Sequence, residues 1–73
     1  MGKDNITIYV KDDNQLQKLR EKYPDVDAEY INMEGQKDVQ GLLPMVCFKD
    51  GQTGEEACET GENYIQQFTK RKI

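Results

Sequence analysis

The two cysteines are the strongest potential nucleophiles in this sequence. Cys47 lies between Val46 and Phe48 in an apolar run, whereas Cys58 lies among carboxylates in Glu55-Glu56-Ala57-Cys58-Glu59. Free cysteine is often buried as a small hydrophobic side chain, so we expect Cys47 to be a core residue. The carboxylates beside Cys58 disfavour its thiolate form. A bridge between the two cysteines depends on the register of a hairpin that the sequence leaves undetermined, and we do not expect one.

The other side chains do not form a recognisable catalytic or metal-binding set. The sequence has no histidine, which removes the usual general base near neutral pH. The two cysteines are too far apart to follow a metal-ligand spacing. Asp25-x-Asp27-x-Glu29 resembles a string of oxygen ligands, but it lacks the glycine and distal glutamate of an EF-hand loop. We therefore expect a protein that is not an enzyme and that needs no metal or cofactor.

Carboxylates carry the clearer functional signal. The net charge is −4, but residues 23–69 hold ten acidic side chains and only two basic ones, Lys37 and Lys49. Such a surface repels nucleic acids and membranes and attracts basic partners. Carboxylates two residues apart on a strand are about 7 Å apart on one face, a spacing similar to that of phosphates along a DNA strand. The alternative is that these charges are solvated, keep the protein soluble and protect edge strands from aggregation.

This signal predicts an acidic module or inhibitor that docks on a basic protein, for example as a DNA-mimic decoy for a nucleic-acid-binding protein. Small acidic inhibitors of histone-like proteins are a known strategy of phage proteins, which makes this an analogy from charge. We expect a cytoplasmic monomer or weak homodimer that contacts neither nucleic acid nor membrane directly. The carboxylates that we assign to partner binding are Asp27, Glu29, Glu55, Glu56, Glu59 and Glu62.

The elements that would position these groups follow from periodicity and turn residues. The 73 residues suffice for one small domain. Strands are predicted at 6–10, 26–33, 45–48 and 55–60, from β-branched, aromatic or alternating apolar residues. Asp12 is expected to cap a helix whose apolar stripe is Leu16, Leu19 and Tyr23, and Pro24 to end it. Residues 35–41 leave room for one or two helical turns, and a last helix buries Tyr64, Ile65 and Phe68. A turn is expected at Asp50-Gly51, and residues 70–73 are expected to form a short basic tail.

This order of elements resembles the glutaredoxin-like core of the thioredoxin superfamily. The resemblance depends mainly on Leu43-Pro44, which matches the cis-proline position of that family, and on Phe48-Lys49-Asp50-Gly51, which matches its strand and turn. It implies an α/β fold over residues 1–73: a four-stranded mixed sheet in the order 2-1-3-4, two longer helices and one short helix. It also implies a cis peptide bond at Leu43-Pro44.

The same resemblance shows what this chain lacks. The redox-active members of that family carry Cys-x-x-Cys at the start of the first helix, where the helix N-terminus lowers the pKa of the first cysteine. Here Asp12-Asp13-Asn14-Gln15 stand in that place, and carboxylates do not exchange disulfides. Two alternatives to acidic docking remain: a thiol protein that forms mixed disulfides through Cys58 or Cys47, and an adaptor that binds peptides in a groove between the Asp12–Asn14 loop and the Leu43-Pro44 turn.

Overall fold

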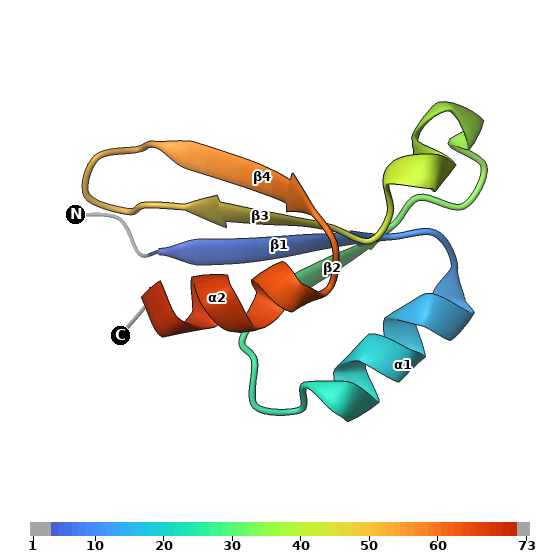
Figure 1. Ribbon diagram of the computed structural model, residues 1–73, viewed down its shortest axis with the longest axis horizontal. Coiled ribbons are helices and arrows are strands. Elements are labelled where there is room, and N and C mark those ends of the chain that lie inside the picture. Colours follow the sequence, from blue (N-terminus) through green and yellow to red (C-terminus); the bar gives the residue numbers. More distant parts are fainter. Residues whose placement is uncertain (1–3, 72–73) are drawn as a thin grey trace.

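The computed structural model describes residues 4–71 and shows a mixed β-sheet with two α-helices packed on one face (Figure 1). The strands follow the order β2-β1-β3-β4; β1 is parallel to β2, and the β1–β3 and β3–β4 pairs are antiparallel. The predicted α/β class and the strand order 2-1-3-4 are therefore confirmed. The elements are β1 (Asn5–Val10), α1 (Asp13–Lys22), β2 (Glu29–Asn32), the 3-10 helix η1 (Lys37–Leu42), β3 (Met45–Lys49), β4 (Glu56–Thr60) and α2 (Asn63–Arg71).

The core lies between the sheet and the two α-helices. Alternate residues of β1 and β3 point toward the helices, where Leu19 of α1 and Ile65 and Phe68 of α2 cover them. The rings of Phe48 and Phe68 stack with their centroids 5.7 Å apart. Burying a large apolar side chain contributes about 1.5–3 kcal/mol, so these few contacts supply much of the stability of so small a domain. The core consists of Ile6, Ile8, Val10, Leu19, Val46, Phe48, Ile65 and Phe68.

The boundaries of α1 follow from its first and last residues, as the sequence predicts. The Asp12 side chain accepts a hydrogen bond from the Gln15 backbone N–H at 2.9 Å and caps the helix. The Gln15 side chain accepts from the Lys11 backbone N–H, one residue earlier than in a standard capping box. Tyr23 ends the helix immediately before Pro24, because a residue that precedes proline avoids helical geometry.

The opposite face of the sheet is largely open. The register places Thr7, Cys47 and Cys58 in one row across β1, β3 and β4 on this face. In Figure 1, α1 and α2 lie below the strands, while η1 lies above them at one end. We call this side of the sheet the open face.

The β3–β4 hairpin differs from the predicted turn. Its chain reversal spans Asp50–Glu55, with backbone hydrogen bonds from Asp50 N to Glu55 O and from Gly54 N to Asp50 O. Within this loop, the glycine with a positive φ is Gly54, at 79°. Gly51 donates its backbone N–H to the Asp4 carboxylate. A turn therefore does begin at Asp50-Gly51, as predicted, but the reversal is longer and its left-handed residue is Gly54, three positions after Gly51.

Other boundaries also differ from prediction by one to a few residues, and one implied feature is confirmed. The second strand is shorter than 26–33, although Val26, Ala28 and Tyr30 do pack against the core from one side. Residues 70 and 71 belong to α2 instead of a tail, while 72–73 lie outside the described residues. The last strand begins at Glu56. The Leu43-Pro44 peptide bond is cis. Within residues 4–71, neither α1, η1 nor α2 is both long and apolar enough to cross a membrane.

Candidate functional site

The hairpin register brings the two cysteines together. Cys47 and Cys58 are direct partners across the β3–β4 ladder and form a disulfide with a Cα–Cα distance of 4.0 Å. Both side chains point to the open face; Cys47 is 5% exposed, whereas Cys58 is solvent-exposed. Our expectation of two unbridged cysteines is therefore wrong, because it depended on a register that the sequence did not specify. Cys47 is buried as expected, but as half of a disulfide.

An apolar pocket of about 230 Å³ adjoins this disulfide on the open face. It extends from β4 across β3 and β1 to η1, and both cysteines contribute to its wall. None of the residues beside the cysteines belongs to the main core, and all of them are partly exposed. We call this cavity the open-face pocket. Its lining is Tyr9, Met33, Val39, Leu43, Met45, Cys47 and Cys58.

β4 carries one group of the predicted carboxylates. It is the terminal strand of the sheet, and all five of its residues are exposed. Glu56 lies opposite Lys49 on the open face, whereas Glu59 lies opposite Val46 and points to the helical side. Glu55 precedes the strand. We call Glu55, Glu56 and Glu59 the β4 acidic edge.

Glu62 follows this edge, but its charge is engaged elsewhere. Its carboxylate lies 3.2 Å from the Lys22 ammonium of α1, and both side chains are substantially exposed. An exposed ion pair of this kind contributes at most about 1 kcal/mol. Glu62 therefore links the start of α2 to α1, and because Lys22 partly neutralises its charge, it presents less free charge than the neighbouring glutamates.

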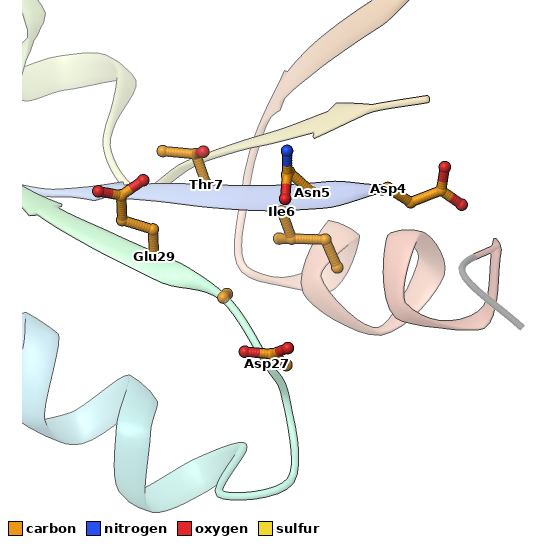
Figure 2. Close-up of a pocket in the computed structure, with 7 residues that line it drawn as sticks. Asp4, Asn5, Ile6, Thr7, Asp27 and Glu29 are labelled. Carbon is orange, nitrogen blue, oxygen red and sulfur yellow. The ribbon is translucent and has the colours of Figure 1, made fainter. Parts of the chain in front are cut away.

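Asp27 and Glu29 lie at the other side of the sheet, around a second and larger cavity (Figure 2). This cavity measures about 550 Å³ and is lined by the start of β1 and the segment leading into β2. Asp4, which the sequence did not single out, is the third carboxylate on its wall. Figure 2 shows the carboxylates of Asp4, Asp27 and Glu29 at separate places around the cavity. Among residues 4–71, no group of three acidic or cysteine side chains is arranged to hold a metal ion.

The predicted carboxylates therefore form two groups and not one surface. β2 and β4 are the two outer strands of the sheet, and neighbouring strands lie about 4.8 Å apart. The separation between the outer strands is thus roughly 14 Å by that spacing. Glu56 and Glu59 also point to opposite faces of β4. A continuous ladder of carboxylates on one face does not form.

A third cavity, of about 440 Å³, adjoins Pro44. Its walls come from the body of α1, through Gln15, Lys18 and Lys22, and from Glu62. The Asp12–Asn14 loop does not line it: Asp12 caps α1, and Asp13 accepts a hydrogen bond from the Asn32 side chain. The start of the first helix is therefore a cap, and the groove beside the proline lies further along the helix.

Comparison of the chain with protein-family models, with curated proteins and with solved structures gives no match. The site must therefore be interpreted from its own geometry. That geometry offers three surfaces: the β4 acidic edge beside the open-face pocket, the acidic cavity at the start of β1, and the groove beside Pro44.

Proposed function

We propose that this protein is a non-enzymatic binding module that docks on a basic surface of a partner protein through the β4 acidic edge. The observation that carries the proposal is the exposure of β4. All five of its residues are exposed, it is the last strand of the sheet, and its two glutamates, Glu56 and Glu59, project to opposite sides. An edge strand that is not covered by other elements offers backbone groups and side chains to a partner together.

Charge determines which partners this edge accepts. The glutamates attract a cationic surface and raise its association rate, and they repel nucleic acids and anionic membranes. A partner that normally binds nucleic acid has such a surface, so a decoy role for the protein falls within this proposal. The decoy would act through the β4 acidic edge alone, because the second group of predicted carboxylates lies on the opposite side of the sheet.

We also propose that the scaffold is a glutaredoxin-like fold without its redox motif. The strand order β2-β1-β3-β4 and the cis Leu43-Pro44 bond support this assignment. The four residues that begin the first helical turn are Asp12, Asp13, Asn14 and Gln15, and none of them can act as a thiol nucleophile. A fold of this kind does not itself determine the function.

Capture of partners from nuclease-treated lysate, with elution by a salt gradient, tests the docking proposal. We expect a basic protein to be released at moderate salt, because charge pairs at an exposed edge are screened. With the partner then purified, Glu56→Gln with Glu59→Gln should weaken binding about tenfold. The matched control is Asp25→Asn with Glu29→Gln, which removes equal charge near the opposite edge and should leave affinity within about twofold.

The same purified partner separates the alternatives. Equal affinity of wild type and the β4 double variant would contradict docking at this edge. The groove beside Pro44 is the second candidate, because two lysines and Glu62 line a cavity there that is large enough for an extended peptide. If the partner stayed bound to wild type at high salt, and Lys18→Gln abolished its binding, the function would be assigned to that groove. Release by reductant alone would instead support mixed-disulfide chemistry at Cys58 or Cys47, which requires the present bridge to open.

A further inference from the structure

We propose that the open-face pocket receives an apolar side chain from an extended, lysine- or arginine-rich segment of the partner that lies along β4. This inference rests on the proposed docking function, because the same acidic edge supplies the charge. It adds the location of an anchor site and the chemistry of the segment that fills it.

The first support is the composition of the pocket. Apart from the tyrosine hydroxyl of Tyr9, the side chains that line it are apolar or belong to the disulfide. Apart from the buried Cys47, these side chains are at least partly exposed, and all of them lie outside the main core. A cavity of about 230 Å³ with such walls suits one large aliphatic side chain, and it offers almost nothing to a polar group.

The second support is the position of the pocket next to the free edge. Cys58, in the middle of β4, forms one wall of the pocket and points to the open face. A peptide strand added to β4 would lie about 4.8 Å beyond it. A residue of that strand opposite Cys58 would share its face, and cross-strand and diagonal neighbours at such spacings are within reach of long side chains. Leucine or methionine at that place can therefore extend over Cys58 into the pocket.

Charge complementarity determines which residues of the partner segment flank its apolar side chain. Glu56 lies two residues before Cys58 on the same face, while Glu55 and Glu59 flank the same edge. Lysine or arginine beside the apolar residue would meet these carboxylates. A second copy of this chain is a poor occupant, because it would bring the same glutamates against this edge, and like charges opposite one another are destabilising. The occupant is thus a cationic segment with one apolar side chain.

A pair of synthetic peptides tests the anchor directly. The first is a nine-residue peptide in which lysine alternates with threonine around one central leucine, and the second has alanine at the centre. Both carry the same charge, so only the apolar side chain differs. We expect the leucine peptide to bind wild type about tenfold more tightly, the scale expected from burying most of an aliphatic side chain.

A variant of the pocket completes the comparison. Val39→Asn makes one pocket wall polar without altering the main core. In this variant the advantage of leucine over alanine should fall to about twofold, while the alanine peptide binds as before. The matched control is Leu42→Asn, which removes an exposed aliphatic side chain from the same short helix outside the pocket. It should retain the full preference for leucine. Unfolding midpoints of both variants verify that each is folded.

The outcomes separate this inference from the function on which it rests. Equal binding of the two peptides to wild type, or the same leucine preference in Val39→Asn, would overturn the pocket assignment. If Glu56→Gln with Glu59→Gln still weakened both peptides in that case, acidic docking would stand without the anchor. If neither the glutamates nor the pocket affected binding, both proposals would fail.

Discussion

Tyr30 is the residue at which burial and hydrogen bonding conflict most clearly. Its hydroxyl is buried and has no hydrogen-bond partner within the described part of the chain. Desolvation by burial raises the pKa of Tyr30 above its ordinary value, and the Arg20 guanidinium, 5.9 Å from the ring centre, partly opposes this shift. A buried donor without a partner costs free energy, so this side chain stabilises the fold through its ring and not through its hydroxyl.

Substitution Tyr30→Phe tests this interpretation. At neutral pH the free energy of unfolding should stay within about 1 kcal/mol of wild type or rise, because the variant removes only an unsatisfied hydroxyl. The pKa of Tyr30 is higher in the folded than in the unfolded protein, so the unfolded state loses this proton first as pH rises. Wild type should therefore lose stability above about pH 10, the ordinary tyrosine value. Urea unfolding at pH 8 and pH 11 should show a smaller loss in the variant; an equal loss in both proteins would contradict the assignment.

Among the strands, β4 contributes least to the core. All of its side chains are exposed, and the core contains none of them. It is held by its ladder with β3 and by the Cys47–Cys58 disulfide. A terminal strand without buried apolar side chains is expected to open at low free-energy cost. The disulfide therefore has a larger structural role here than it would have within the core.

Reduction of the Cys47–Cys58 disulfide should substantially lower the free energy of unfolding. The cysteines are 11 residues apart, and the loop-closure relation gives about 3 kcal/mol for a bridge of that span. A domain of this size has a total stability on the order of 5 kcal/mol, so most of it depends on the bridge. Urea unfolding of wild type with and without reductant should show this difference. Cys47→Ala with Cys58→Ala is the control: it should unfold near the reduced midpoint and not respond to reductant, whereas an unchanged wild-type midpoint would contradict the role of the bridge.

In the molecule as a whole, the basic residues lie mainly on the α-helices and the acidic residues on the outer strands and loops. Three of the cationic residues lie on α1 and two on α2, whereas segment 23–62 holds ten acidic and two basic side chains. The helical layer is therefore balanced or basic, and the outer strands and loops are acidic. Charged residues on an outer strand oppose pairing between copies, so the glutamates of β4 should limit self-association in addition to the docking role that we propose for them.

This distribution of charge predicts how the oligomeric state changes when the glutamates of β4 are neutralised. Wild type should sediment as a monomer at micromolar concentration, because antiparallel pairing through β4 would bring glutamates together. Glu56→Gln with Glu59→Gln should shift sedimentation toward dimers, by at least tenfold in the dissociation constant. Asp25→Asn with Glu29→Gln should change it less. A monomeric double variant at high concentration would show that these glutamates do not limit self-association.

Local sequence patterns were enough to predict which helices and strands form and how they follow one another along the chain. The β-branched and aromatic run of β1, the near-continuous apolar run of β3, the cap at Asp12 and the stop at Pro24 are local signals, and each is present in the fold. The buried residues of α2 follow from a helical stripe in the same way. These predictions succeeded because periodicity and capping depend on neighbours within a few residues along the chain.

Which distant side chains come into contact could not be predicted from these local patterns. The Cys47–Cys58 bridge depends on the register of β3 with β4, and a shift of one residue would send the cysteines to opposite faces. The loop that sets this register is fixed by hydrogen bonds of Asp50 with residues 52–55, which no single dipeptide signals. In the same way, the open-face pocket joins residues of β1, η1, β3 and β4. These features arise from contacts between distant segments, for which the local pattern of one chain carries no direct signal.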